Sequence, residues 1–335
     1  MFFNTKVLQY SSDMDSVSKE INRLLNIVSR SFALCIPKLP KAVRSEVGNF
    51  YLLCRYADSI EDSDIALSGK KKYFRRFLAC LKKEDRFAVL ALSKELLPKI
   101  RAKNDQELFR SFEKVFLQFD GFDKKSKKIA LHWLAEMVRG MQKYSKKEIE
   151  NFLDLDNYCY YVAGTVGFFV TEICDHKFGL NKFDLLISKA RDFGLLLQKV
   201  NIIRDFSKDY VNGKTFWPKA LFRKQKMEVK GAFEKSNAEK RRIILQEMVE
   251  SAESHIDSTL EYLKNLPVEL RFACAIPFYM AVPTLAKCSG NDEVFDAHKK
   301  VKIGRAKTFK ILSDIEKNAG SDRFLEDYLY ALNEK

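Results

Sequence analysis

The scarcity of chain-breaking residues is the feature that most constrains the fold of this chain. Only 13 Gly and 7 Pro occur in 335 residues, so tight turns are few and the elements between them must be long. Apolar residues recur every three to four positions almost throughout, as in helices that bury one face, and strand-type alternation is rare. We therefore expect an all-α protein with helices over 14–34, 42–62, 70–82, 86–100, 105–119, 125–144, 156–175, 182–210, 237–264, 268–288 and 301–316, and a short helix that closes the chain.

The domain organisation follows from what the sequence lacks. No internal repeat, low-complexity linker or shift in composition divides the chain, so we expect one all-α domain over residues 1–335, with about 20 peripheral residues at each end. A hydrophobic content of 46% with 27 Phe suits a wide apolar interior.

The formal net charge of +14 points to anionic partners. Phosphorylated substrates and anionic lipid surfaces both fit, and peripheral contact with a membrane stays open. No RNA-recognition signature, zinc-finger spacing or basic-leucine repeat accompanies the basic runs, so we do not expect a nucleic-acid partner. The sequence leaves the oligomeric state open.

The expected location is the cytoplasm, with the inner membrane surface as a peripheral alternative. Seven scattered cysteines without a C-x-x-C pattern favour a reducing compartment. The apolar run at the N-terminus is too short for a signal peptide. The longest apolar run, 273–286, contains Pro277 and Pro283 and falls short of a membrane span, so it predicts a kinked core helix.

Two short acidic clusters carry the chemistry. Asp58, Glu61 and Asp62 share one helical face at i, i+3 and i+4, and Asp205 and Asp209 do so at i, i+4. Like charges at this spacing weaken a helix by roughly 0.2–0.5 kcal/mol per pair, so a cation should compensate them. A single such cluster is usually a solvated surface, but two that each follow an apolar helix favour a site. Mg²⁺ takes one or two carboxylates together with substrate phosphates, so two facing acidic helices would hold a diphosphate.

Polar side chains precede each cluster on the same helical face. Arg55 lies one turn before Asp58, where it can pair with that carboxylate or direct its guanidinium at a phosphate. Gln198 and Asn201 share a face with Asp205 and Asp209. A polar stripe on so apolar a helix is costly unless it is hydrogen-bonded or metal-bound, which favours a lined cavity.

A third pattern is Tyr158-Cys159-Tyr160-Tyr161-Val162-Ala163-Gly164-Thr165-Val166-Gly167. Each Gly in a helix costs about 1 kcal/mol relative to Ala, so the small residues need a reason. They either let two helices approach closely or leave room for a substrate chain. The phenol of Tyr161 could then move a proton while its ring faces a cation.

These motifs resemble the squalene and phytoene synthase family. The resemblance rests on Ser29-Arg30-Ser31-Phe32, the run 50–62, the 158–167 run and the segment 197–205, in this order, and it covers residues from about 25 to about 310. Within the family, Gly213-Lys214-Thr215-Phe216-Trp217-Pro218 and the segment 274–286 are similar to the squalene-forming branch.

The resemblance implies an isoprenoid-synthase bundle of helices around one central cavity. Two farnesyl diphosphates would join head to head through presqualene diphosphate, and reduction by NADPH would give squalene. It implies Mg²⁺ ligands at Asp58, Glu61, Asp62, Asp205 and Asp209 and a proton-handling phenol at Tyr161. The substrate would be held by Ser29, Arg30, Phe32, Arg55, Gln198, Asn201 and Arg204, and the NADPH phosphates by Lys300 and Lys302.

Three alternatives stay open at this stage. A non-reductive relative would stop at presqualene diphosphate or make dehydrosqualene or phytoene. A helical assembly factor of the same family would have no activity, although all five metal carboxylates are present. A basic helical nucleic-acid binder would bind tightly and in a salt-sensitive way without turnover.

Overall fold

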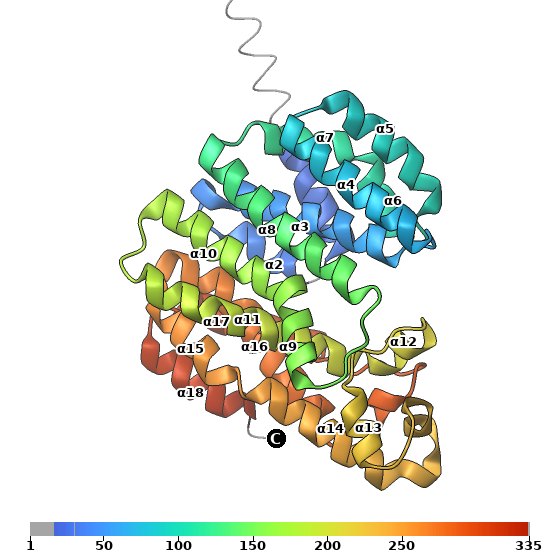
Figure 1. The fold of residues 1–335 in the computed structure, drawn as a ribbon. Helices are drawn as coiled ribbons and strands as arrows, with labels where there is room; N and C mark the ends of the chain where they lie inside the picture. The colour runs from blue at the N-terminus through green and yellow to red at the C-terminus, as the bar shows by residue number, and fades with distance from the viewer. Residues whose placement is uncertain (1–16, 30, 334–335) are drawn as a thin grey trace, which may run out of the picture. The chain divides into compact units, whose positions relative to one another are not determined.

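The computed structural model describes residues 17–29 and 31–333, and this part of the chain contains helices and no strand (Figure 1). The expectation of an all-α fold is confirmed. The chain divides into two compact units, one made of Met1–Ser145 and Glu172–Gly179 and the other of Lys146–Thr171 and Leu180–Lys335. The expectation of a single domain stays a prediction.

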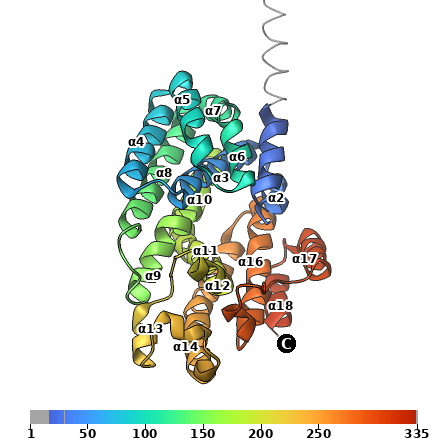
Figure 2. The ribbon, with the colours of Figure 1, turned by 90° about the vertical axis from the view of Figure 1, so that its right-hand side faces the viewer.

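Unit 1 is built around the helix α3 (Lys41–Asp62), which contacts η1, α4, α6, α7 and α8 (Figures 1 and 2). A helix over 17–28 precedes it. The other elements of this unit are α2 (Phe32–Cys35), η1 (Ile36–Lys38), α4 (Leu67–Lys83), α5 (Arg86–Leu96), η2 (Leu97–Lys99), α6 (Lys103–Arg110), α7 (Phe112–Asp120), α8 (Lys124–Tyr144) and the second half of α10 (Thr165–Phe178).

The buried face of α3 explains its central place. Phe50, Leu53, Ala57 and Ile60 are at most 1% exposed, as the apolar spacing of this helix predicts. The Tyr56 ring packs in an aromatic cluster with Phe77, Phe109 and Phe112, and its hydroxyl donates to the backbone carbonyl of Leu108 in α6. This hydrogen bond satisfies the one polar atom that the ring carries into the core.

Unit 2 is built around α11 (Phe183–Arg204), which contacts α9, the segment after it, α14, α15 and α16. Its elements are α9 (Phe152–Cys159), η3 (Tyr160–Gly164), the first half of α10, α12 (Phe206–Val211), α13 (Lys219–Lys224), η4 (Val229–Phe233), η5 (Lys235–Asn237), α14 (Ala238–Glu253), α15 (Ile256–Asn265), α16 (Val268–Cys288), η6 (Asp292–Phe295), α17 (Arg305–Asn318) and α18 (Asp322–Asn333). Figure 2 shows α16 beside α17 and α18.

The helix α16 is the apolar segment that the sequence assigns to the core. It runs through Pro277 and Pro283. By length and composition it is the one helix in the described part of the chain that could cross a membrane, but 83% of its most apolar window is buried in the protein. A core helix passes the same test, so the finding is weak support for a membrane span.

Four predicted helices are interrupted, and this corrects their predicted extents. The helix expected over 14–34 is interrupted at Ser29 and Ser31, that over 105–119 at Ser111, that over 237–264 at Ser254 and His255, and that over 182–210 at Asp205. Asp205 has φ −99° and ψ 11°, outside the regular helical values. The next residue, Phe206, packs its ring 4.1 Å from that of Trp217 and 5.5 Å from that of Phe233. These tertiary contacts set the direction of α12, which helical periodicity could not reveal.

The helix expected over 156–175 contains a π-helical segment, Tyr160–Gly164. This segment packs closely against Gly194 of α11. A methyl group added at Gly194 would lie 2.5 Å from the carbonyl oxygen of Ala163 and 2.6 Å from the amide nitrogen of Gly164. One added at Gly167 would lie 2.3 Å from the carbonyl oxygen of Ala190. Close helix approach therefore explains Gly167, whereas a methyl group at Gly164 would meet mainly the Tyr160 side chain, 3.2 Å away, and room for a substrate chain stays a prediction.

We predict that Gly194→Ala destabilises the protein, because the added methyl group meets backbone atoms that cannot move aside. The free energy of unfolding should fall by about 1–3 kcal/mol, measured by denaturant titration. Gly48→Ala in the middle of α3 is the matched control, since its methyl group would meet only side chains, none nearer than 3.5 Å. Gly48→Ala should be neutral or slightly stabilising. Equal stability of the two variants would contradict the close packing at Gly194.

Candidate active site

The predicted carboxylates of unit 1 lie in the last turn of α3. Asp58 is about one third exposed, Glu61 is half-buried and Asp62 is exposed, and this turn contains no basic residue. The C-terminal end of a helix carries a partial negative charge, so three carboxylates there produce a strongly negative potential that favours a cation. Lys70 of α4 supplies one cation, since its Nζ donates to the backbone carbonyl of Glu61 at 2.6 Å.

Arg55 occupies the centre of this cluster. Its Nη1 lies 3.2 Å from Asp58 Oδ2, and its Nη2 lies 2.8 Å from Oδ1 of Asp105, a buried carboxylate at the start of α6. Burial opposes the guanidinium charge, but Asp58 and Asp105 outweigh it and raise the pKa of Arg55. Of the two roles that the sequence left open, the structure shows the ion pair. Asp105 was missed because a single Asp near a helix start gives no signal beyond a cap.

The predicted residues Ser29 and Phe32 lie next to Tyr51. Tyr51 precedes Arg55 by one turn of α3 and lies on the same side of that helix. Ser29 Oγ accepts from the backbone amide of Phe32 at 3.0 Å, and the Phe32 ring lies 5.0 Å from that of Tyr51. Burial raises the pKa of Tyr51 to about 12, and a hydrogen bond with Ser29 offsets part of that effect. Arg30 lies outside the described residues. Unit 1 thus brings Ser29, Phe32 and Arg55 to one side of α3.

In unit 2 the predicted residues lie where α11 passes into α12. Asp205 is the junction residue, and Asp209 follows one turn later, with its backbone amide donating to the carbonyl of Asp205 at 2.9 Å. Both side chains are half-buried. The Arg204 guanidinium donates to both carboxylate oxygens of Asp205. Each acidic cluster therefore has one arginine paired to its first carboxylate.

An aromatic cluster holds this junction in place. Trp217 is 1% exposed, and its indole N–H donates to the carbonyl of Ile202 in the last turn of α11 at 3.2 Å. The Tyr210 ring stacks on that of Phe233 at 4.6 Å. Both ends of α12 are thus fixed by rings, which keeps the two carboxylates one helical turn apart.

Gln198 and Asn201 lie on the accessible side of α11, half-buried and exposed respectively. Between them, Lys199 faces the opposite way and is 2% exposed. Its ammonium group lies 2.6 Å from Asp156 Oδ1, 2.7 Å from Ser251 Oγ and 2.9 Å from His255 Nε2. A buried lysine needs such partners because an unpaired charge in the core is costly. The sequence analysis missed it, since a lone lysine on an apolar helix gives no specific signal.

The His255 ring extends this network to a second residue of α11, Asp192. Its Nδ1 lies 3.1 Å from Asp192 Oδ1 on α11, and the hydrogen bond to His255 holds the pKa of Asp192 below its usual value. Lys199 and its partners therefore tie α11 to α9 and to the end of α14. The network fixes the rotation of α11, and with it the direction of Gln198 and Asn201.

Tyr161 lies in the π-helical segment of unit 2. Its ring is half-buried and 5.0 Å from that of Tyr160, and its backbone carbonyl accepts from Thr165 Oγ1 at 2.8 Å. Segments with π geometry are frequent at functional sites. The role of Tyr161 as a proton-handling phenol stays a prediction.

Lys300 and Lys302 are exposed in the segment that joins η6 to α17. Val301 between them is 1% exposed, and Lys287 Nζ donates to the carbonyl of Lys302 at 3.2 Å, so the segment is held at both points. Two exposed ammonium groups two residues apart are a donor set that fits a phosphate.

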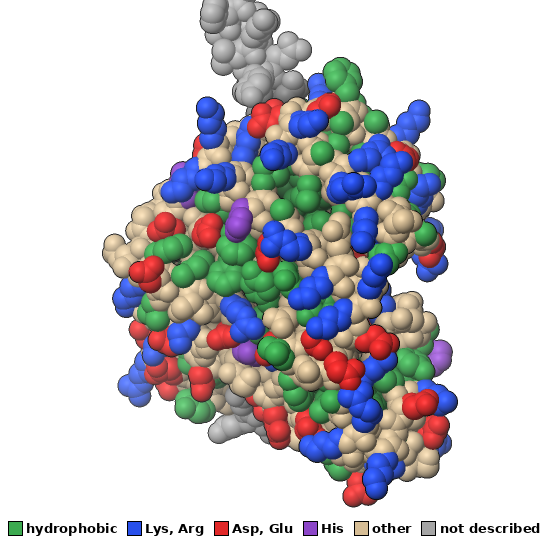
Figure 3. Space-filling view, in the orientation of Figure 1, with side chains coloured by type: hydrophobic (Ala, Val, Ile, Leu, Met, Phe, Trp, Pro, Cys, Tyr) green, Lys and Arg blue, Asp and Glu red, His purple; other side chains and the backbone are tan. Residues whose placement is uncertain are grey.

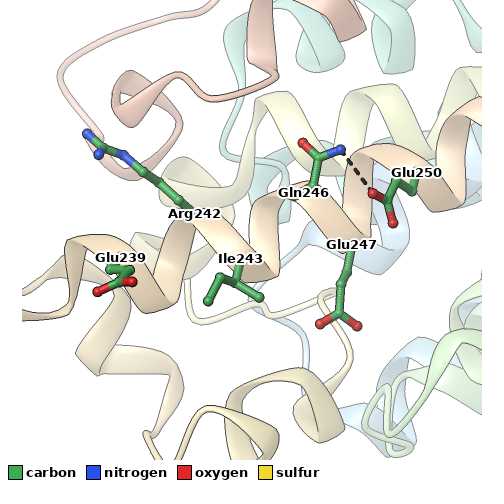
Figure 4. Close-up of a pocket in the computed structure, with 6 residues that line it drawn as sticks. All are labelled: Glu239, Arg242, Ile243, Gln246, Glu247 and Glu250. Atoms are coloured by element: carbon green, nitrogen blue, oxygen red, sulfur yellow. Dashed lines mark hydrogen bonds between the residues drawn. The ribbon is translucent and has the colours of Figure 1, made fainter.

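A surface groove of the structure lies elsewhere, along α14 (Figure 4). Its lining residues all come from that one helix: Glu239, Arg242, Ile243, Gln246, Glu247 and Glu250. Gln246 Nε2 donates to Glu250 Oε1 at 3.0 Å. None of these residues belongs to the predicted site, and the mixed charges of an open groove indicate no particular ligand.

The donor sets at the two acidic clusters fit Mg²⁺ by their chemistry. Among residues 17–29 and 31–333, no group of three or more His, Cys, Asp and Glu side chains is arranged to hold a metal ion by itself. Mg²⁺ does not require one, because it commonly binds through one or two carboxylates with water and substrate phosphates in the other positions. The clusters therefore suit an ion that arrives with a diphosphate.

Comparison with known proteins gives one consistent result. Residues 25–307 match the family described as Squalene/phytoene synthase. Squalene synthase of Homo sapiens is 32% identical over 308 residues, which cover 88% of this chain and 70% of the human protein. The structure of TcSQS with the ligand BPH1237 matches with a TM-score of 0.83 at 29% identity, over 95% of this chain and 91% of that one. A dehydrosqualene synthase solved with a ligand shares the fold, with a TM-score of 0.64 at 19% identity over 91% of this chain and 98% of that one.

We predict that Lys199→Met lowers the free energy of unfolding by about 2–4 kcal/mol. The substitution leaves Asp156 and His255 without their cation, and the partial exposure of Asp156 keeps the loss below that of a fully buried pair. Lys189→Met, on the same helix, removes a surface ion pair with Glu261 and should cost less than about 1 kcal/mol. Denaturant unfolding of both variants measures the difference. Similar losses of unfolding free energy would show that the buried network stabilises the protein no more than a surface ion pair does.

Proposed function

This chain belongs to the squalene/phytoene synthase family, and we propose that it is a squalene synthase, a farnesyl-diphosphate farnesyltransferase. The observation that carries the proposal is the 32% identity to human squalene synthase across 88% of the chain. The match to TcSQS, at a TM-score of 0.83, agrees with it. The fold alone cannot choose between the branches, because a dehydrosqualene synthase shares it.

The proposed substrate is farnesyl diphosphate, two molecules of which join head to head through presqualene diphosphate. In unit 1, Ser29, Phe32 and Arg55 lie along one side of α3 and would bind it, together with Arg30 of the preceding segment. In unit 2, Gln198, Asn201 and Arg204 lie along the accessible side of α11 and would do the same. Guanidinium and amide groups suit the oxygens of a diphosphate.

The proposed metal ligands are Asp58, Glu61, Asp62, Asp205 and Asp209. All five are at least partly accessible. Asp58, Glu61 and Asp62 lie at the C-terminal end of α3 and Asp205 at that of α11, where the helix dipole favours a cation, and Asp209 follows in the first turn of α12. Bound Mg²⁺ would offset the charge of the departing diphosphate. Arg55 and Arg204 would orient the first carboxylate of each group by the ion pairs already present.

The proposed roles of the other site residues follow from their side chains. The Tyr161 phenol would hold and move a proton, and its ring, beside that of Tyr160, would face an allylic cation. Lys300 and Lys302 would bind the phosphates of NADPH, the cofactor that supplies hydride to complete squalene. We place the enzyme in the cytoplasm, in agreement with seven buried cysteines.

The reductive step gives the sharpest test of this function. Purified protein with farnesyl diphosphate, Mg²⁺ and NADPH should form squalene, identified by mass spectrometry. Omission of NADPH should abolish squalene and leave presqualene diphosphate or a more unsaturated product. The same product with and without NADPH would assign the chain to the non-reductive branch. Turnover of geranylgeranyl diphosphate in preference to farnesyl diphosphate would indicate a phytoene-type enzyme, and no turnover of either would favour a non-catalytic role.

We predict that Asp58→Asn and Asp205→Asn each lower kcat/KM on the order of 100-fold or more, since each removes a metal-binding charge. Their melting temperatures should stay near that of the wild type, because both side chains are partly exposed. Asp64→Asn is the matched control: Asp64 follows the same cluster but pairs with Arg101 at the surface. Near-normal turnover of the first two variants would remove Asp58 and Asp205 from the proposed metal site.

A further inference from the structure

The helix α4 has a one-sided charge that the proposed reaction does not use. Its sequence, Leu67–Lys83, contains seven basic residues and no acidic one. Five of these side chains are exposed: Lys71, Lys72, Arg75, Lys82 and Lys83. None of the five forms an ion pair among those the structure records, although Lys72 acts at a distance on Glu95. The concentration of unneutralised charge on one helix requires a partner or an explanation.

The five exposed cations form one face, which we call the α4 basic face. At 3.6 residues per turn, their positions fall within an arc of about 120°. The opposite side of α4 is buried through Tyr73, Phe74 and Phe77, which are at most 7% exposed. The helix is therefore fixed by its apolar side and directs its cations outward, so the face is a permanent feature of unit 1.

Exposed apolar side chains adjoin the end of this face. A two-residue turn, Glu84 and Asp85, joins Lys83 to α5, where Phe87 is 84% exposed and Leu90 is 41% exposed. They lie one turn apart on the same side of α5. Because only a few residues separate Lys83 from Phe87, the ring lies at the same end of the helix pair as Lys82 and Lys83. An aromatic ring so exposed beside a cationic helix marks an interaction surface.

The acidic residues of the turn do not cancel the charge of the face. Asp85 caps α5 by accepting from the amide of Ala88 at 2.9 Å. Glu84 lies 2.8 Å from Lys127 of α8, which brings a second basic segment to the turn. Lys124 and Lys128 of that segment are exposed. In the space-filling view, Lys and Arg side chains predominate over Asp and Glu in the upper part, where Figure 1 labels α4, α5 and α7 (Figure 3).

We propose that the α4 basic face, together with Phe87 and Leu90, binds the surface of an anionic lipid bilayer. Basic side chains near such a surface are attracted by its negative potential, and exposed apolar side chains enter the boundary between headgroups and acyl chains. The combination distinguishes lipid from nucleic acid, because Leu90 gains nothing from phosphates or stacked bases but gains by leaving water for hydrocarbon. This binding is independent of the proposed reaction.

The test is sedimentation of the full-length protein with lipid vesicles. Vesicles of phosphatidylcholine and phosphatidylglycerol at a ratio of 7:3 should bind the protein, and vesicles of phosphatidylcholine alone should not. Arg75→Gln/Lys82→Gln/Lys83→Gln should weaken binding on the order of 100-fold, from about fivefold per removed charge. Phe87→Ser should weaken it on the order of tenfold, and the loss should persist at salt concentrations that screen charge.

The matched control removes the same number of charges from exposed positions of unit 2. Lys235→Gln/Lys240→Gln/Lys317→Gln has the same net charge as the test variant and should bind the 7:3 vesicles nearly as well as the wild type. Squalene formation from detergent-dispersed substrate and the melting temperature should be unchanged in both triple variants, which separates lipid binding from catalysis and folding. Equal weakening by the two triple variants would reduce the effect to overall charge and overturn the proposal. So would binding of duplex DNA or RNA without binding of vesicles, or an unchanged affinity of Phe87→Ser.

Discussion

Carboxylates at the negative ends of two buried helices are the constraint around which each unit is organised. In α3, Asp58, Glu61 and Asp62 add their charge to a helix end that is already electronegative, and in α11 the same is true of Asp205. A sequence tolerates this only where cations are supplied. Arg55 and Arg204 supply one each, and Lys70 binds a carbonyl of the α3 end. The carboxylates that these cations do not neutralise are the ones we propose as ligands of Mg²⁺.

The surroundings of these helix ends are rigid for identifiable reasons. The α3 end is held by the aromatic cluster around Tyr56, and the α11 end by Trp217 and the rings that stack about Phe206. On the side of α11 opposite Gln198 and Asn201, the ion pair and hydrogen bond of Lys199 fix the rotation of the helix about its axis. Packing of apolar side chains alone would define this rotation less well. A buried ion pair contributes little net stability, but its geometry is specific, and here it fixes the direction of Gln198 and Asn201, which we propose bind the diphosphate.

Much of this could be predicted from the sequence, because the signals were local. Scarce Gly and Pro with helical periodicity indicated the all-α fold, and the spacing of Asp58, Glu61 and Asp62 placed them on one helix. The break at Asp205 could not be predicted, since it depends on contacts of Phe206 with Trp217 and Phe233. Asp105 and Lys199 were missed for the same reason. The role of a single charged residue depends on partners that are distant in sequence, so no local pattern indicates it. The only sequence signal of the π-helical segment was its content of small residues, which fitted either close helix packing or room for a substrate.

That segment has a consequence for how the chain can vary. A π turn holds one residue more than an α turn, so the side chains of α10 beyond it are out of phase by about 100° with those of α9. If the segment rewound as an ordinary α-helix with the same number of residues, Gly167 would rotate away from Ala190. Deleting one amino acid between Tyr160 and Gly164 would instead restore an ordinary helix and leave Gly167 facing Ala190. The loss of one residue would therefore preserve the packing of α10 and change only the directions of the side chains inside the segment, Tyr161 among them.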